Sequence, residues 1–325
     1  MQVFTLKSHK CLYILGYVLA QRNFVLTIFN RILAPAICIA LSTGALQAEP
    51  LKTAFPGLLE QVSDEYRAGL EALDILQGKI VLPGGQAALD VPDGYYFLDA
   101  ADARYVLETL WENPPSPETL GMLFPRDKSP IDDSWGIEIS FDPMGYVSDE
   151  DAANTDYVEL LATMKQDFLD GNDARVKDGY PRIELLGWAA EPRYDAAEQK
   201  LYWAKTLHFE GEDGNTLNYN IRALGRKGVL VLNFIAGSDQ LSQVEAAAPA
   251  VLKMISFTDG NRYTDFIPGT DTLAAVGIGG LIAGKVAAKA GLLVLALAFL
   301  KKGFVLILLP LIWLKKKLFG KRPET

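Results

Sequence analysis

Residues 183–235 contain four strand-like segments in succession, and they limit the folds open to the chain more than any other feature. The second and third connections include Glu212-Asp213-Gly214-Asn215 and Arg226-Lys227-Gly228, which are typical of turns. Strands joined by short turns are antiparallel neighbours. The sequence therefore predicts an antiparallel meander with strands over 183–188, 201–209, 216–224 and 228–235. The last strand is apolar at nearly every position, which predicts a central strand covered on both faces.

Apolar residues at three- and four-residue spacing predict helices around this sheet. The expected helices cover 55–75, 100–112, 155–170 and 239–255, the last bent or divided at Pro249. Asp99 is expected to cap the second helix, and Gly171-Asn172 to end the third. Further strands are predicted over 79–82, 87–91 and 134–141. An antiparallel β-sheet with helices packed on it is an α+β fold.

Charge is distributed unevenly along the 325 residues. Residues 1–48 hold four basic side chains and no acidic one, and residues 273–325 hold nine basic side chains and one acidic. The middle, 49–272, keeps 18 basic and 39 acidic side chains, a net charge of −21. An acidic middle excludes a nucleic-acid partner, because binding to phosphates needs a basic face. Its 224 residues are enough for one domain with a sizeable core.

The first 48 residues predict a signal peptide or leader. Arg31 is followed by an apolar stretch over 32–41 and by small residues over 42–48, which is the order found in secretory signals. Cleavage after Ala48 or Ala45 would release an extracytoplasmic α+β domain over 49–272. An uncleaved N-terminal membrane anchor is the alternative.

Residues 273–314 predict a membrane-anchoring region, with apolar blocks separated by lysines. A single crossing near 286–309 is favoured, because it places a basic cytoplasmic tail, 315–325, on the side where Lys and Arg collect. The tail residues that fix this orientation are Lys315, Lys316 and Lys317. Gly280 and Gly284 have the spacing that lets membrane helices pack closely, which leaves a homo-oligomer open as an outcome.

Few chemistries are available to the middle segment. The two cysteines, Cys11 and Cys38, lie in the predicted leader, and only His208 of the two histidines lies outside it. This excludes thiol catalysis and Cys- or His-rich zinc sites, so no catalytic residue, metal or cofactor is predicted. Glu138 and Asp142 are the alternative: paired carboxylates could act as acid and base in a hydrolase.

A candidate binding surface comes from the predicted strand over 216–224. Its polar residues alternate with apolar ones and so share one face, and we expect nearby aromatic and imidazole side chains to join them. The candidate binding residues are Trp188, Tyr202, His208, Asn218, Asn220 and Arg222. The alternatives are that the polar residues are the solvated face of the sheet, and that Trp188 and Trp203 belong to the core.

Several blocks resemble one family of bacterial membrane-anchored proteins, the domain of unknown function 2167. They are Gly187-Trp188-Ala189, Pro192-Arg193-Tyr194-Asp195, Leu201-Tyr202-Trp203-Ala204-Lys205, Asn215-Thr216-Leu217-Asn218-Tyr219-Asn220 and Gly225-Arg226-Lys227-Gly228-Val229-Leu230. The likeness covers roughly 75–310. It implies an exported domain with a C-terminal membrane anchor, and it transfers no activity or catalytic residue. The order of elements also resembles that of PsbP- and Mog1-type sandwiches.

These observations favour a membrane-anchored envelope protein, in the bacterial inner membrane with its main domain periplasmic, over an enzyme. The exported domain is expected to bind a protein or another envelope ligand, and the bilayer is its other partner. Two alternatives stay open. One is a carboxylate-dependent hydrolase of envelope polymers, and the other is a component of an oligomeric membrane assembly.

Overall fold

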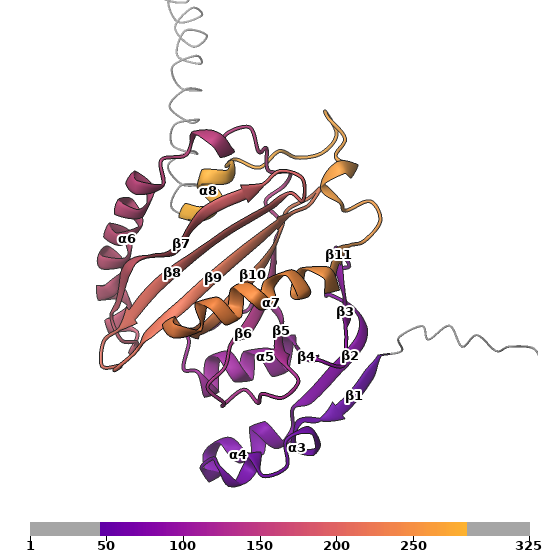
Figure 1. Ribbon diagram of the computed structural model, residues 1–325, viewed down its shortest axis with the longest axis vertical. Helices are drawn as coiled ribbons and strands as arrows, with labels where there is room; N and C mark the ends of the chain where they lie inside the picture. Colours follow the sequence, from indigo (N-terminus) through magenta and orange to yellow (C-terminus); the bar gives the residue numbers. More distant parts are fainter. Residues whose placement is uncertain (1–45, 285–325) are drawn as a thin grey trace, which may run out of the picture. The chain divides into compact units, whose positions relative to one another are not determined.

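The computed structural model describes residues 46–284, which form an eleven-stranded sheet (Figure 1). The strand order is β11-β3-β2-β4-β5-β6-β10-β9-β8-β7, with β1 paired to β2, and all the pairs are antiparallel. The predicted α+β class and the meander over β7–β10 are therefore confirmed. In chain order the strands are β1 (Gln47–Pro50), β2 (Asp74–Val81), β3 (Ala87–Val91), β4 (Tyr95–Asp99), β5 (Thr119–Pro125), β6 (Gly136–Asp142), β7 (Ile183–Asp195), β8 (Lys200–Phe209), β9 (Asn215–Leu224), β10 (Val229–Gly237) and β11 (Ile255–Phe257).

Helices cover both faces of this sheet. The α-helices are α3 (Leu51–Ala54), α4 (Asp64–Glu71), α5 (Ala100–Arg104), α6 (Tyr157–Lys177), α7 (Leu241–Met254) and α8 (Ile278–Ala283). The short 3-10 or π-helical turns are η2 (Leu58–Glu60), η3 (Tyr105–Leu110), η4 (Ala152–Asn154), η5 (Ser238–Gln240) and η6 (Tyr263–Asp265). Asp99 caps α5 as predicted, because its Oδ1 accepts hydrogen bonds from the backbone N–H groups of Ala101 (2.8 Å) and Asp102 (3.0 Å).

The largest core lies between α7 and one face of the sheet (Figure 1). Along β10 this face carries Leu230, Leu232 and Phe234, all fully buried, and α7 contributes Val244 and Val251. Every second residue of a strand faces the same side, so the apolar run of β10 supplies this core with alternate residues only. β10 is central, between β6 and β9, as predicted.

The opposite face of the sheet is covered in two separate places. Near β4 and β5 it packs on α3, α4 and α5 through a cluster that includes Tyr96 and Phe124. Near β7 and β8 it packs on α6 and α8 through a cluster that includes Trp203 and Ile282. Between them, Val231, Asn233 and Ile235 of β10 are half-buried. On this face the prediction that β10 is covered is therefore met at Val229, which is buried in the cluster near α6 and α8, but not at Val231 and Asn233.

Two predicted helices have different bounds because pairing with the sheet outweighs local periodicity. The helix expected over 55–75 is reduced to η2 and α4, since residues 74–77 pair with β1 instead. The stop expected at Gly171-Asn172 was wrong, and α6 continues to Lys177. Asn172 is 4 % exposed, and its amide bonds both the N–H and the C=O of Ile183 at the start of β7.

The fold extends beyond the predicted domain boundaries at 49 and 272. β1 begins at Gln47, and Ala48 pairs with Leu76, so a cut after Ala48 would divide this strand. At the other end Ile278 and Ile282 of α8 are buried against the domain, which corrects the assignment of residues 273–284 to the membrane anchor. The other predicted leader and anchor residues, within 1–45 and 285–325, lie outside the described residues. Within 46–284 no helix has the length and apolar character needed to span a membrane.

Candidate functional site: a polar groove on the sheet

The gap between the two helical covers is a groove of about 890 Å³ above β6, β10 and β9. Its floor comes from one face of three paired strands. Glu138 lies opposite Asn233, and Asn233 lies opposite Asn220 of the next strand, which is buried and does not itself line the groove. Two residues further along each strand, Ser140 lies opposite Val231, and Val231 lies opposite Arg222. The walls include Leu107 and Pro114 on one side, and Val276 and Leu281 on the other. A hydrogen-bonding floor between partly apolar walls is typical of ligand sites.

Glu138 is the acidic member of the floor and is only 8 % exposed. Thr119 donates to its Oε1 (3.3 Å) and the Asn233 amide donates to its Oε2 (2.8 Å). Burial raises the pKa of Glu138, while the hydrogen bonds from Ser140, Asn233 and Thr119 and the charge of Arg222 oppose that rise. The carboxylate is thus held in place by neutral donors.

Arg222 is the basic member of the floor. Its Nη1 donates to Asn233 Oδ1 (3.0 Å) and to the carbonyl of Ile221 (3.1 Å), and its Nη2 donates to Asn220 Oδ1 (3.5 Å). The guanidinium carbon lies 4.9 Å from the centre of the Trp203 ring, within cation–π range. Burial lowers the pKa of Arg222 to about 10, and the charges of Glu138 and Asp142 act in the opposite direction.

A second cation, Lys205 on β8, lies opposite Asn218 of β9 on the same face of the sheet. Its Nζ is 5.8 Å from the centre of the Phe168 ring of α6. Burial, and to a lesser extent the positive charge of Arg222, lowers the pKa of Lys205 to about 8. The two cations therefore act on each other, although only Arg222 lines the groove.

The structure brings together half of the predicted binding residues. Asn218, Asn220 and Arg222 lie on one face of β9 as expected, and Asn218 and Arg222 line the groove. Asn220 is 2 % exposed, which corrects the alternative of a solvated sheet face at this position. Asn233 and Lys205 were not predicted to lie here. A signal for both was present, because each is a polar residue at an alternate position of a strand next to β9.

The other three predicted binding residues lie elsewhere. Tyr202 belongs to the core beneath α7, on the opposite face of the sheet. His208, near the end of β8, is paired with Asn215 through Nδ1 and Oδ1 at 3.1 Å. Trp188 on β7 donates its Nε1–H to the carbonyl of Tyr157 (3.3 Å) and packs beside the α6 cluster. Trp203 is 2 % exposed and belongs to the core, as the alternative interpretation of this residue predicted.

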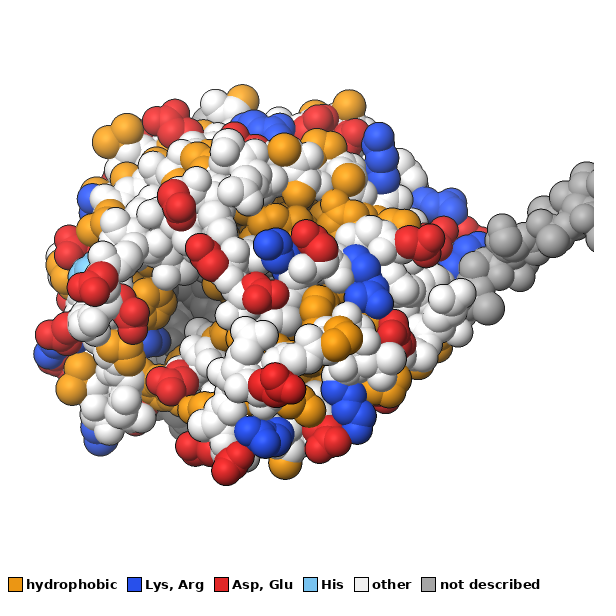
Figure 2. Space-filling model, turned by 60° about the horizontal axis from the view of Figure 1, so that its bottom comes forward, with side chains coloured by type: hydrophobic (Ala, Val, Ile, Leu, Met, Phe, Trp, Pro, Cys, Tyr) orange, Lys and Arg blue, Asp and Glu red, His pale blue; other side chains and the backbone are white. Residues whose placement is uncertain are grey.

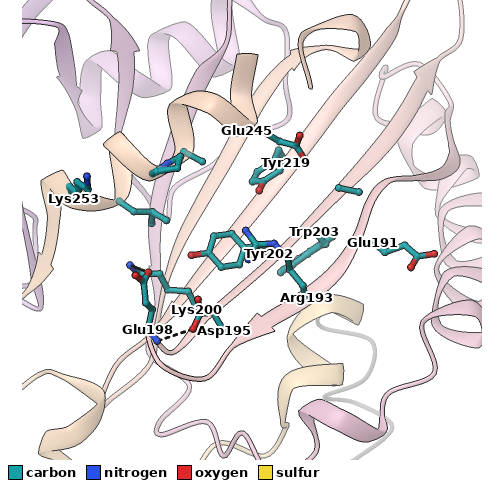
Figure 3. Close-up of a pocket in the computed structure, with 14 residues that line it drawn as sticks. Glu191, Arg193, Asp195, Glu198, Lys200, Tyr202, Trp203, Tyr219, Glu245 and Lys253 are labelled. Atoms are coloured by element: carbon teal, nitrogen blue, oxygen red, sulfur yellow. Dashed lines mark hydrogen bonds and ion pairs between the residues drawn. The ribbon is translucent and has the colours of Figure 1, made fainter. Parts of the chain in front are cut away.

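A smaller cleft of about 460 Å³ lies between α7 and strands β7–β9 (Figure 3). The guanidinium carbon of Arg193 lies 3.9 Å from the ring centre of Tyr202, and Glu245 and Tyr219 lie above it in this view. Lys200 forms an ion pair with Glu198 (2.8 Å). The charged side chains that line this cleft are exposed or half-buried and of both signs, so the cleft indicates no particular ligand.

Glu138 and Asp142 share one face of β6 but are four residues apart. Four residues of strand span about 13 Å. The paired carboxylates of hydrolases are closer, at no more than about 9.5 Å from each other. The backbone spacing therefore does not favour the acid–base pair. Within residues 46–284 no cluster of three or more His, Cys, Asp or Glu side chains could hold a metal ion.

Residues 74–312 match the family described as "Protein of unknown function (DUF2167)". The chain belongs to this family. The match spans most of the chain and agrees with the resemblance of the strand blocks over 187–230. No curated protein matches the sequence. The family description assigns no activity, so the groove has to be interpreted from its own geometry.

Two solved structures are similar to this chain at low sequence identity. The cyanobacterial PsbP (CyanoP) of Synechocystis sp. PCC 6803 is 11 % identical, with a TM-score of 0.33 over 55 % of this chain and 91 % of that chain. The Ran-binding protein Mog1p of Saccharomyces cerevisiae is 12 % identical, with a TM-score of 0.31 over 60 % of this chain and 100 % of that chain. At these scores the likenesses say nothing about the ligands of this chain.

Proposed function

We propose that this protein is a non-enzymatic binding protein of the bacterial cell envelope, and that its ligand occupies the groove above β6, β10 and β9. The observation that carries the proposal is the gap in the helical cover. The same sheet face is sealed on both sides of the gap, by α3–α5 and by α6 with α8. Between these two covers, the part of the sheet that carries Glu138, Asn233 and Arg222 lines a groove.

On the face drawn in Figure 2, the arrangement of charge favours a ligand recognised by specific groups in the groove over one attracted by a patch of single-sign charge. The face drawn in Figure 2 is hollowed, and its acidic and basic side chains are interspersed. A large patch of one sign, which would steer a highly charged partner, is not visible on that face. Specific hydrogen-bonding groups are instead collected on the groove floor.

The membrane location is also part of the proposal, and the sequence supports it. A basic, apolar leader precedes the domain, and an apolar segment followed by Lys315, Lys316 and Lys317 follows it. Gly284, which lines the groove, is separated from the proposed crossing at 286–309 by residue 285 alone. An exported domain anchored in this way would hold its ligand close to the inner membrane.

Photocrosslinking in intact cells tests the proposed site. A photoreactive residue at Ser116, which lines the groove, should give a discrete adduct on the full-length chain. The same residue at Gly214, an open position in the β8–β9 turn, is the control. Adducts of equal yield and identity at both positions, or none at Ser116, would contradict a ligand in the groove.

Topology reporters test the location separately. A reporter inserted after Asp259, in an exposed turn, should be active only outside the cytoplasm, and one fused after Thr325 only inside. The full-length chain should resist carbonate extraction of the membranes. Cytoplasmic activity at the Asp259 site would overturn the envelope location while leaving the groove as a binding site.

A further inference from the structure

We infer that the groove accepts a carboxylate carried on an apolar ligand, and that Arg222 is the residue that binds it. The inference rests on the proposed binding function and names the chemical class of the ligand. It is argued from the partners of Arg222, from the neighbouring charges and from the character of the groove walls.

All the hydrogen-bond acceptors of Arg222 are neutral. They are the side-chain oxygens of Asn220 and Asn233 and a backbone carbonyl. Among the described residues no carboxylate comes within 4.0 Å of its guanidinium nitrogens. A guanidinium has five N–H donors, and its Nε–H takes part in no hydrogen bond with the described residues. Glu138 and Asp142 line the same groove but form no direct pair with Arg222, so an anion in contact with the guanidinium would add a charge-assisted hydrogen bond that the described residues do not supply.

The orientation of this guanidinium is fixed before any ligand arrives. Trp203 packs against it at 4.9 Å, and Asn220 and Asn233 hold its two terminal nitrogens. Trp203 Nε1 is the one buried side-chain nitrogen or oxygen in the described part of the chain that lacks a hydrogen-bond partner. A planar fork held in this way matches the two oxygens of a carboxylate.

Nearby charges favour a singly charged anion over a doubly charged one. Lys205 adds a second positive charge on the same face and forms no ion pair within residues 46–284. Against these two cations stand Glu138 on the floor, and Glu118 and Asp142, which also line the groove. Three carboxylates would repel a doubly charged phosphate more strongly than a carboxylate. The balance therefore favours the carboxylate.

The walls give the rest of the ligand its character. Leu107, Pro114 and Pro115 line the groove beside Met144, Val276 and Leu281. Apolar side chains on both sides of a charged floor suit a ligand with an apolar body and one carboxylate. A free inorganic anion would leave these walls without contact.

Ligand titrations of the full-length chain in nanodiscs test the inference. The probe is sodium hexanoate, with hexanol and inorganic phosphate at matched ionic strength, and the readout is intrinsic tryptophan fluorescence. Hexanoate should bind at least about 10-fold more tightly than phosphate, and hexanol should not compete with it. Equal binding of hexanol, or tighter binding of phosphate, would overturn the carboxylate.

Variants assign the binding to Arg222. Arg222→Gln should weaken hexanoate binding at least about 10-fold, because a charge-assisted pair is lost. Arg193→Gln removes an exposed arginine in the cleft below α7 and should leave the affinity unchanged. Lys205→Met keeps every hydrogen bond of Arg222 and should still weaken binding about threefold or more. An affinity of Arg222→Gln within twofold of wild type would overturn the inference, whatever the result for Lys205→Met.

The outcome is separable from the proposed function. If hexanoate fails to bind while the Ser116 crosslink persists, the groove binds a ligand of another chemistry. If the crosslink persists in Arg222→Gln, Arg222 does not bind a carboxylate of the ligand. The groove would still be a binding site.

Discussion

Glu138 and Arg222 are joined through a single amide, that of Asn233. The amide nitrogen donates to Glu138 Oε2 at 2.8 Å, and the amide oxygen accepts from Arg222 Nη1 at 3.0 Å. Asn233 lies on β10, between the strands that carry the other two residues. It therefore separates the two opposite charges and forms a hydrogen bond with each of them. The arrangement leaves Arg222 without a direct ion pair and still fixes its position.

Replacing this amide should disturb both charges at once. Asn233→Leu removes one hydrogen bond from Glu138 and one from Arg222, so we expect the free energy of unfolding to fall by about 1–3 kcal/mol. Asn218→Leu is the matched control, because the side chain of Asn218 lines the same groove and makes no hydrogen bond with the described residues. Urea unfolding of both variants should show a loss in the first only. Equal midpoints would contradict the role given to Asn233.

Lys205 should make stability depend on pH in the alkaline range. Its pKa is lowered by burial to about 8 from 10.5, so between these values the unfolded chain binds the more protons and stability rises with pH. Below about pH 8 both states carry the charge, and the folded state bears the whole cost of burying it. Lys205→Met should therefore be more stable than wild type at pH 7, with an advantage that shrinks between pH 8 and 10.5.

Urea midpoints at pH 7, 9 and 10.5 measure this difference. Lys253→Met, at an exposed position of α7, serves as the control and should change the free energy of unfolding by no more than about 0.5 kcal/mol. A constant difference between Lys205→Met and wild type across the range would show that Lys205 keeps its charge in the fold.

Much of the meander could be predicted from the sequence because each strand carries its own signals. Alternation in β9 correctly placed Asn218, Asn220 and Arg222 on one face, and short turns gave the antiparallel order. The partners of that face could not be predicted, since Glu138 and Asn233 are 95 residues apart in the chain and meet only through the pairing of β6 with β10.

The errors have a common physical cause, which is that long-range contacts outweigh local preference. β4 and β5 were not predicted, and they pair with each other across the intervening α5 and η3. Tyr202 alternates onto the α7 face because its neighbours in register, Ile221 and Arg193, fix which side it takes. Gaps in a helical cover depend on tertiary packing, so the groove itself leaves no local pattern in the sequence.

Asn172 gives a test of one such long-range contact. Its amide pairs with both backbone groups of Ile183, at 2.8 and 3.0 Å, much as a neighbouring strand would. Asn172→Ala should lower the free energy of unfolding by about 1–3 kcal/mol, because two backbone groups lose their partner at a partly buried site. Gln166→Ala, on an exposed turn of the same helix, should cost no more than about 0.5 kcal/mol. Hydrogen exchange at Ile183 should accelerate in the first variant alone.

Gly228 tests how closely β6 and β10 must approach to form the groove floor. Its φ is +159°, and a Cβ there would lie 2.1 Å from the backbone oxygen of Asp142 and 2.9 Å from the Phe141 ring. Because a backbone atom cannot move aside as a side chain can, Gly228→Ala should separate Val229 from Asp142, its partner in register. We expect the free energy of unfolding to fall by about 1–3 kcal/mol.

Gly214→Ala is the control for this substitution. Nothing lies within 4 Å of a Cβ at Gly214, so the added methyl meets open space, and we expect a change within about 0.5 kcal/mol. Thermal and urea unfolding compare the two variants on the full-length chain. If Gly228→Ala is as stable as Gly214→Ala, β10 does not approach β6 as closely as described at this end of the groove. The spacing of the floor residues, which follows from the pairing of these two strands, would then also be wrong.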